Sequence, residues 1–348
     1  MTLGWVAALI LVAAHLGTRL WIGVAPTDMP AAGKIHTRPI PTTGGLPVVV
    51  AFLGGLWALW RWGEAPLTTE HLVGLTVAAV LVLALGVYDD LRGTSAWEKL
   101  VVEAAAAVVL FVAGFRIVAL TNPLGDAIPL GWLALPVTVG WLLIVTNAVN
   151  VIDGLDGLAA GVVAIAALTL FGIALRFEET TIAVLALPLA AATLGFLPLN
   201  WPPARVFLGD TGSLTLGFVL GATSLLENRK GTVAVTLLLP MVLLAIPLLD
   251  AALAFVRRVR RGRHPFRRDT EHLHHRLLGL GLTPRQILTV VYGLAVCLGL
   301  TAYLMSVMPK QFVAVIVLIL GIGGVVGLRM LAYLEGAVER TRGSGGST

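Results

Sequence analysis

Cysteine and charge are both scarce in this chain of 348 residues. The single cysteine, Cys297, excludes a disulfide framework and a cysteine-ligated zinc site. Only 12% of the residues are charged, against roughly 25% in a typical soluble domain. The mean hydropathy is +0.92, and the connections between apolar runs are too short for a separate soluble domain. The composition therefore predicts an all-α polytopic integral membrane protein.

Apolar runs long enough to cross a bilayer recur along the whole chain. A spanning helix needs about 20 apolar residues, which gives about eleven spans, or ten if one is merged or removed. The first run lacks the basic start of a cleaved signal peptide, so we expect it to be retained. Pro240 and Pro247 predict a kink or break in the ninth run. The predicted spans are 3–25, 44–62, 71–88, 99–115, 131–150, 158–176, 181–199, 214–229, 233–256, 286–308 and 311–334.

Lysine and arginine predict the orientation of these spans. With the N-terminus outside, most basic residues fall in cytoplasmic loops, where the positive-inside rule expects them. The sequence pI is near 9.8, but the basic residues flank spans, so we expect contacts with lipid headgroups and no nucleic acid. We therefore expect a multi-pass protein of a bacterial-type plasma (inner) membrane. The basic residues left on the opposite side are Arg61, Arg116, Arg176, Arg229, Lys230 and Lys310.

Six charged or polar segments interrupt the apolar chain, and the predicted topology places all of them on the cytoplasmic side. Carboxylates beside membrane spans are costly unless they bind something. We therefore expect one site, built from cytoplasmic loops, that uses a metal ion and handles a phosphorylated ligand. The segments are 34–36, 89–90, 147–156, 207–210, the arginine run from Arg257, and 272–275.

The first carboxylates of the site are the adjacent pair Asp89 and Asp90. Two neighbouring carboxylates repel each other unless a cation or a role as a base relieves the pair. A Mg²⁺-bound phosphate would supply that relief, and Lys99, which opens the next span, would add a point charge for phosphate oxygens. A solvated loop end beside a positive-inside arginine is the alternative.

Asparagine and aspartate recur every three residues from Asn147 to Asp156. In a helix this spacing places Asn147, Asn150, Asp153 and Asp156 along one stripe. Oxygen ligands without cysteine or histidine select Mg²⁺, with Mn²⁺ possible, over zinc. The alternative is a helix-capping turn between spans.

The loop 207–213 reads FLGDTGS. Asp210 is placed to ligate a metal ion, the glycines and Ser213 suit a turn that offers backbone N–H groups to an anion, and Phe207 suits stacking on a planar base. The alternative is a turn in which Thr211 or Ser213 caps the next helix.

The longest predicted cytoplasmic loop, 257–285, contains His272, His274 and His275. Three histidines in four residues suggest zinc. Because no cysteine accompanies them and arginines surround them, we expect a cluster that contacts phosphate. A basic helix on the membrane surface is the alternative.

Together these segments resemble the polyprenyl-phosphate N-acetylhexosamine-1-phosphate transferase superfamily. The likeness runs from about Asp28 to Leu282 and includes five motifs in family order. It implies transfer of a sugar-1-phosphate from a UDP-sugar to a membrane polyprenyl phosphate, with release of UMP. It also implies a single transmembrane catalytic domain over 1–335, and a homodimer is a further expectation. We expect 336–348 to be a disordered tail or a remnant of cloning.

The resemblance also implies roles for individual residues. Asp210 and Asn150 would hold Mg²⁺, Asp89 would be the base on the lipid phosphate with Asp90 supporting it, and Lys99 would contact the diphosphate. Whether an aspartate instead forms a covalent intermediate is open at this point. The other implied assignments are Asp153, Asp156 and Phe207 in the uridine pocket, His272, His274 and His275 at the sugar-phosphate end, and Lys34, Arg38 and Arg276 among the cations that bind substrate.

The histidine segment also indicates a branch of this superfamily. Residues 272–277 read HLHHRL and are similar to the HxHH pattern of WecA/TagO-type enzymes, unlike the triple-histidine loop of the MurNAc-pentapeptide translocases. UDP-GlcNAc or a related UDP-sugar is therefore the expected donor, with the phospho-MurNAc-pentapeptide reaction as the alternative. Thr42 and Thr270 stand where the pattern often carries arginine, and Arg38, Arg267, Arg268 or Arg276 would substitute.

Two readings from other classes compete with a transferase. A transporter of nucleotide sugars or other anions also carries charges on broken spans, but its sites lie near the bilayer midplane and usually come from internal repeats. Here the charges lie at span ends and no clear repeat is present. A catalytically dead lipid-binding subunit is disfavoured because the metal and base candidates are all present.

Overall fold

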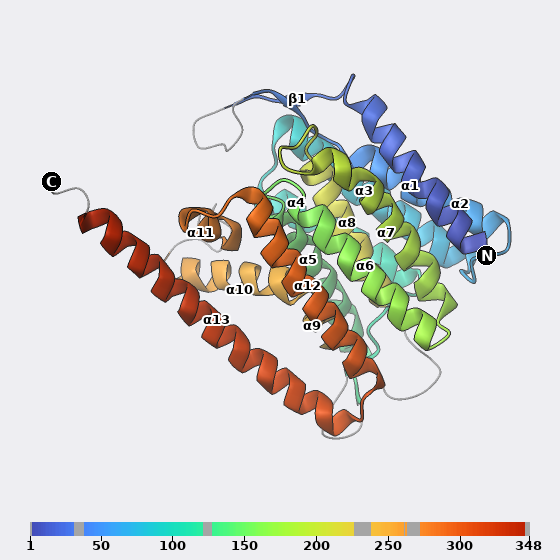
Figure 1. The fold of residues 1–348 in the computed structure, drawn as a ribbon. Helices are drawn as coiled ribbons and strands as arrows, with labels where there is room; N and C mark the ends of the chain where they lie inside the picture. Colours follow the sequence, from blue (N-terminus) through green and yellow to red (C-terminus); the bar gives the residue numbers. More distant parts are fainter. Residues whose placement is uncertain are drawn as a thin grey trace.

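The structure is a computed structural model and describes residues 2–30, 38–120, 127–225, 238–260, 262 and 272–344, without the side chains of 238, 239, 310 and 336–344. Helices dominate this part of the chain (Figure 1). They are α1 (Thr2–Trp21), α2 (Gly45–Arg61), α3 (Thr69–Arg92), α4 (Ala96–Val112), α5 (Ala134–Ile152), α6 (Leu158–Arg176), α7 (Thr180–Asn200), α8 (Gly209–Thr223), α9 (Leu238–Leu243), α10 (Ala245–Arg260), α11 (Leu273–Gly279), α12 (Pro284–Val307) and α13 (Lys310–Ser344).

Extended structure in the described residues is limited to two minimal hairpins. Strand β1 (Thr27–Asp28) pairs antiparallel with β2 (Ile40–Pro41), and β3 (Ala119–Leu120) pairs antiparallel with β4 (Ile128–Pro129). A 3₁₀ turn, η1 (Gly131–Leu133), leads into α5. The hairpins lie in connections between helices, so the fold of the described residues is all-α.

Seven helical segments of the described chain are long and apolar enough to cross a membrane: 2–21, 69–92, 131–152, 158–176, 180–200, 284–307 and 311–335. Each of the eleven segments predicted as spans contains a helix, and α2 is a shorter apolar helix. The prediction of an all-α polytopic membrane protein is therefore confirmed.

Several helices begin where the sequence offers a polar cap. The Thr68 hydroxyl accepts from the backbone N–H of His71 at the start of α3. Ser95 and Glu98 form a capping box that opens α4. Thr283 and Gln286 form a second one at α12, where proline occupies the first turn. Because such caps satisfy backbone N–H groups that lack a partner in the helix, they fix where these helices start.

The ninth predicted span is broken, as its prolines predicted. Helix α9 ends at Leu243 and α10 begins at Ala245. Pro247 lies in the first turn of α10, where a missing backbone N–H costs little. In Figure 1, α10 runs across the bundle at a steep angle to α12. Helix α10 carries Asp250, which lies beside the start of α11.

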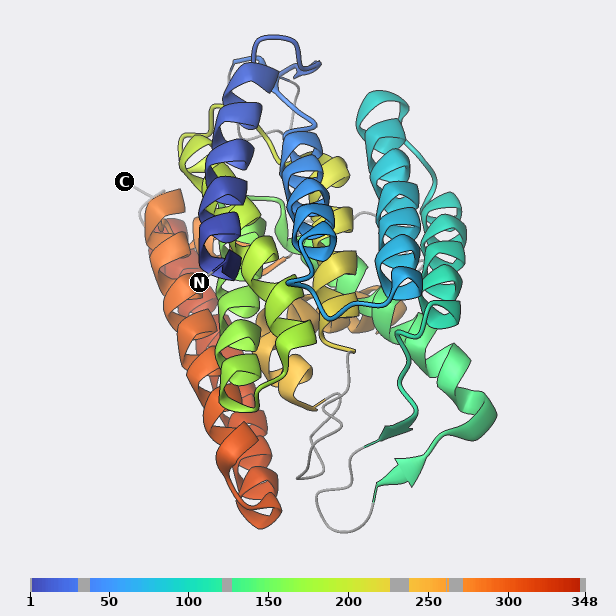
Figure 2. The ribbon, with the colours of Figure 1, turned by 90° about the vertical axis from the view of Figure 1, so that its right-hand side faces the viewer.

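Helix α8 forms the centre of the bundle. Every residue from Thr211 to Thr223 is buried, and α2, α3, α5, α6 and α7 all pack against this helix (Figure 2). Glycines allow the close approach. A Cβ on Gly86 of α3 would lie 2.6 Å from the Cα of Thr211, and one on Gly217 of α8 would lie 3.1 Å from the Cα of Thr146 on α5. Small residues at helix contacts are the usual means of tight packing in membranes.

The last helix, α13, diverges from the bundle and forms a V with α12 (Figure 1). Its apolar side chains, among them Leu318, Ile322 and Val326, are exposed, as expected of a helix whose surroundings are lipid. The helix continues to Ser344, through most of the residues for which we expected a disordered tail, and residues 345–348 lie outside the described part.

Candidate active site

Three pairs of helix ends meet at one end of the bundle. Helices α3, α5 and α7 end there, whereas α4, α6 and α8 begin there; Figure 2 shows α3 and α4 running side by side in opposite directions. Three of the six polar segments predicted to share one face, 89–90, 147–156 and 207–210, belong to these ends, whereas segment 34–36 lies outside the described residues. The hydrogen bonds described next join them into one cluster.

Lys99 links two of the predicted carboxylates. Its Nζ donates to Asp89 Oδ2 at 2.9 Å and also to Asp210 Oδ2. Thr94 fixes the other oxygen of Asp89, because its backbone N–H donates to Oδ1 at 2.7 Å and its hydroxyl donates to the same atom. The three charged side chains are between 15% and 24% exposed, so an incoming ligand can reach them.

Asp90 points to a different partner from its neighbour. Its carboxylate accepts from the backbone N–H of Asp210 at 2.9 Å, from that of Thr211 at 3.0 Å and from the Thr211 hydroxyl at 2.6 Å. A Cβ on Gly209 would lie 3.0 Å from the Asp90 Cγ, which leaves glycine as the residue that fits, and its φ of +72° favours glycine too. These contacts support a positioning role for Asp90, which anchors the start of α8 and so places Asp210.

Asn150 lies next to Asp210, as the predicted pair of metal ligands requires. The Asn150 amide donates from Nδ2 to Asp210 Oδ2 at 3.3 Å and accepts at Oδ1 from the Ser213 hydroxyl at 3.2 Å. The predicted helical stripe is only half helical. Asn147 and Asn150 lie on α5, whereas Asp153 and Asp156 follow its end, because the chain turns at Gly154 and at Gly157, where φ is +77°.

A buried carboxylate that we did not predict, Glu103, completes this cluster. It is 0% exposed, and its Oε2 accepts from Asn147 Nδ2 at 2.6 Å, while the same amide also donates to the Leu143 carbonyl at 2.9 Å. The other oxygen of Glu103, Oε1, is buried and has no hydrogen-bond partner among the described residues. The available signal was its position four residues after Lys99, which puts both side chains on one face of α4.

The residues assigned to the uridine pocket lie on two loops that are bonded together. Asp156 accepts from the backbone N–H of Ala204 at 2.9 Å. Asn200, which we had not assigned, accepts from the Gly157 N–H at 2.8 Å and donates to the Val206 carbonyl at 2.9 Å. Phe207 is half-buried in the second loop. The structure thus holds the 153–157 loop against the 201–207 loop.

Asp153 stands at the end of α5, outside the apolar span. Burial, together with the negative charges of Asp210, Asp90 and Asp156, raises the pKa of Asp153 well above its usual range. A carboxyl in such surroundings gains from a cation or a hydrogen-bond donor brought by a ligand.

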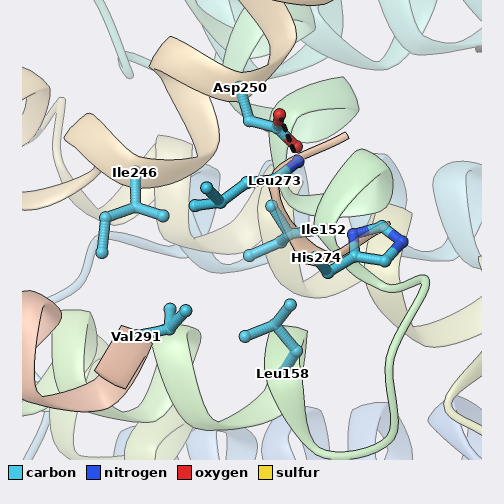
Figure 3. A pocket seen from close by; sticks show the side chains of 7 residues that line it. All are labelled: Ile152, Leu158, Ile246, Asp250, Leu273, His274 and Val291. Carbon is cyan, nitrogen blue, oxygen red and sulfur yellow. Dashed lines mark hydrogen bonds between the residues drawn. The ribbon is translucent and has the colours of Figure 1, made fainter. Parts of the chain in front are cut away.

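The predicted histidines lie at the start of α11, beside the 153–157 loop. His272 Nδ1 donates to Asp250 Oδ2 of α10 at 3.2 Å. His274 is 3% exposed and covers Gly154, where a Cβ would lie 2.6 Å from the His274 Cε1. Burial, with a contribution from His275, lowers the pKa of His274 to about 4. Figure 3 shows Asp250 beside Leu273, and His274 at the edge of a small apolar cavity.

The basic residues expected to bind substrate do not all lie at the site. Arg276 donates from Nε and Nη2 to the two carboxylate oxygens of Glu335 on α13, both at 2.7 Å, so this arginine joins α11 to α13. Arg38 is exposed and lies three residues before Pro41, whose carbonyl accepts from the Phe207 N–H at 2.8 Å. Lys34, Arg267 and Arg268 lie outside the described residues.

The oxygen atoms of the site are of the chemical type that binds a hard divalent cation. Asp89, Asp210 and Glu103 lie around Lys99, and carboxylate and amide oxygens are the ligands that Mg²⁺ and Mn²⁺ prefer. Within the part of the chain that the structure describes, no group of three or more histidine, cysteine, aspartate or glutamate side chains has the spacing of a preformed metal site. In this arrangement the Lys99 ammonium offsets the negative charge of the Asp89 and Asp210 carboxylates.

Comparisons with known proteins identify the family of this chain. Residues 72–228 match the family model described as glycosyl transferase family 4. The chain is 33% identical to a Bacillus subtilis protein named probable undecaprenyl-phosphate N-acetylglucosaminyl 1-phosphate transferase, over 85% of this chain and 82% of that protein. It is 35% identical to decaprenyl-phosphate N-acetylglucosaminephosphotransferase of Mycobacterium leprae, over 76% and 72%.

A third relative comes from Salmonella typhi and is named undecaprenyl-phosphate alpha-N-acetylglucosaminyl 1-phosphate transferase. Its identity to this chain is 29%, over 87% of this chain and 84% of the relative. All three alignments cover more than two thirds of both partners, so they extend over the bundle and the site. The chain therefore belongs to glycosyl transferase family 4, among its WecA/TagO-like members.

Proposed function

We propose that this protein transfers GlcNAc-1-phosphate from UDP-GlcNAc to undecaprenyl phosphate or a related polyprenyl phosphate, with release of UMP. The names of the three relatives support the sugar phosphate and the lipid class. The observation that carries the proposal for this chain is Lys99 held between Asp89 and Asp210 at the ends of three helices. One cation between two carboxylates suits a reaction that joins two phosphorylated substrates.

The reaction forms one P–O bond and breaks another. An oxygen of the lipid phosphate attacks the phosphorus that carries the sugar, and the bond from that phosphorus to the bridging oxygen of UMP breaks. Asp89 takes the proton of a monoprotonated lipid phosphate, since Thr94 and Lys99 hold its carboxylate in place. Lys99 offsets the negative charge that accumulates as the two phosphates approach.

Mg²⁺ is the proposed cofactor, and Asp210 and Asn150 are the residues that would hold it. When bound, it neutralises charge on the donor diphosphate. Asp90 keeps Asp210 in position through the start of α8. The 153–157 and 201–207 loops would take the uridine end of the donor, and the histidines of α11 its sugar-phosphate end.

The proposed topology has about eleven spans with the N-terminus outside and the site facing the cytoplasm. Several described arginines lie at the site end of the bundle, among them Arg92, Arg205 and Arg285, and they support this orientation through the positive-inside rule. Arg61, Arg116 and Arg176 lie near the opposite end, at the other ends of α2, α4 and α6. A bacterial inner membrane, where UDP-sugars are present on the cytoplasmic side, fits this arrangement.

The test is UMP release by the purified full chain from UDP-GlcNAc and undecaprenyl phosphate, with Mg²⁺ or with excess EDTA. We expect release only when lipid phosphate and Mg²⁺ are both present. Asp210→Asn should reduce it at least about 100-fold. Arg92→Gln, an exposed change at the same end of the bundle, should keep wild-type activity. Absence of release from every UDP-HexNAc donor, UDP-MurNAc-pentapeptide included, would overturn the proposal.

A further inference from the structure

A buried carboxylate outside the predicted motifs, Asp250, holds the histidine segment. It lies on α10, is 5% exposed, and bonds twice to residues more than twenty positions away in the chain. Its Oδ1 accepts from the backbone N–H of Leu273 at 2.9 Å, and its Oδ2 accepts from His272 Nδ1 at 3.2 Å. A carboxylate is expensive to bury, and these two donors compensate for the water it loses.

The contacts of Asp250 define which nitrogen of His272 carries the proton. A carboxylate can only accept, so Nδ1 is the protonated nitrogen, and Nε2 remains for another partner. Among the described residues, Nε2 of His272 has no hydrogen bond. A carboxylate that orients an imidazole in this manner is a common means of presenting the second ring nitrogen to a ligand.

The oriented ring lies next to the rest of the site. The rings of His272 and His274 are parallel within 8°, with centroids 6.1 Å apart, and the His274 ring covers the backbone of Gly154. Residue 153, the neighbour of that glycine, belongs to the carboxylate-lined end of the bundle. Helix α10, which runs across the bundle in Figure 1, carries Asp250 to this place, and Figure 3 shows its side chain beside Leu273.

We propose that Asp250 is a positioning residue for sugar-phosphate transfer: it fixes the start of α11 and holds His272 with Nε2 available to the donor substrate. The proposal rests on the proposed function and adds to it a residue and the tautomer of a histidine. Asp250 acts only through His272 and α11.

Asp250→Asn separates the two tasks of this residue. Its amide oxygen can still accept from the Leu273 N–H, whereas its NH₂ group would face Nδ1 of His272 and move the ring proton to Nε2. We expect a Tm close to wild type and a kcat/KM for UDP-GlcNAc about 10- to 100-fold lower, with a raised KM. Asp250→Ala should lower both Tm and activity. Glu64→Gln, an exposed change at the opposite end of the bundle, is the matched control.

Two measurements distinguish this role from a merely structural one. In ¹⁵N-histidine NMR spectra of the full chain in detergent, His272 should be protonated at Nδ1 in the wild type and at Nε2 in Asp250→Asn. In a double-mutant cycle, Asp250→Asn should add little to the loss caused by His272→Gln. Wild-type kinetics in Asp250→Asn, additive losses, or an unchanged tautomer would overturn the proposal. UMP release by the wild type is measured alongside, so its absence would refute the transferase separately.

Discussion

At the scale of single residues, adjacent side chains divide the work of the site. Consecutive positions on a helix point about 100° apart, so Asp89 meets Lys99 while Asp90 meets the start of α8. The histidines also have different partners, because His272 bonds to Asp250 and His274 covers Gly154. A short motif therefore contributes both substrate-facing and supporting groups.

Lys99 gives the first prediction. Lys99→Met should lower kcat at least about 100-fold, because it removes the cation that two carboxylates share. Lys99→Arg should restore part of the activity, since it keeps the charge but not the geometry. The measurement is steady-state UMP release beside the control Arg92→Gln. Lys99→Met with more than about a tenth of wild-type activity would contradict the role assigned to this lysine.

His274 gives a prediction about pH. Its pKa is about 4 in the folded protein and near 6.5 in an unfolded chain, so between these values the unfolded state binds more protons. The stability that the neutral ring contributes is complete above pH 6.5 and is lost as the pH falls toward 4; it amounts to at most about 3 kcal/mol. We expect Tm in detergent to fall over this range. His274→Leu should show a shallower fall, and an equal slope in both proteins would refute the assignment.

At the scale of elements, α8 sets the position of the site. Its first turn carries Asp210 and packs against α3 through Gly86, where a Cβ would lie 2.6 Å from the backbone nitrogen of Thr211. Backbone atoms cannot move aside as a flexible side chain does. The start of α8 and the end of α3 therefore form one rigid unit.

Gly86→Ala should displace this unit. We expect at least a tenfold loss of kcat, because an added methyl group forces Asp210 away from Lys99. Gly54→Ala is the matched control: Gly54 lies inside α2 with no atom near an added Cβ, and alanine suits a helix interior better than glycine. UMP release and Tm of both variants provide the measurement. Wild-type activity in Gly86→Ala would show that α8 tolerates the shift.

Asp90→Ala tests the anchor of the same helix. The change removes three hydrogen bonds to a carboxylate and leaves two backbone N–H groups of α8 without that partner. We expect a stability loss of about 2 to 3 kcal/mol and a lower Tm together with lower activity. Asp89→Asn should instead lose activity at nearly unchanged Tm. If Asp89→Asn lowered the Tm and Asp90→Ala left it unchanged, Asp89 would be the anchor of α8 and Asp90 the group that acts on substrate.

At the scale of the whole molecule, the two ends of the helix bundle should be exposed on opposite sides of the membrane. A reagent on one side should therefore reach residues at one end only. In a Cys297→Ser background, Arg92→Cys lies at the site end and Glu64→Cys at the other, and both positions are exposed. A membrane-impermeant maleimide should label Arg92→Cys in inverted vesicles and Glu64→Cys in right-side-out vesicles. The opposite labelling would reverse the proposed orientation.

Much of the architecture could be predicted from the sequence, because long apolar runs and proline positions are local signals. The break near Pro247 followed from such a signal, whereas the gathering of Asp89, Lys99, Asn150 and Asp210 was expected from the one-sided placement of the charged segments and from the family resemblance. The roles of Glu103, Asn200 and Asp250 could not. Their partners Asn147, Gly157 and His272 lie 22 to 44 residues away, and which polar groups meet depends on the rotation of each helix about its axis.

Three aspartates of this protein also connect segments that lie far apart in the sequence. Asp90, Asp156 and Asp250 each accept a backbone N–H from a segment far along the chain, at Asp210, Ala204 and Leu273. An alanine scan scored by activity alone would therefore rank them beside Asp89 and Asp210, although these backbone contacts are structural. In genetic data on this protein, an inactive aspartate variant identifies a catalytic group only when the amount of folded protein in the membrane is unchanged.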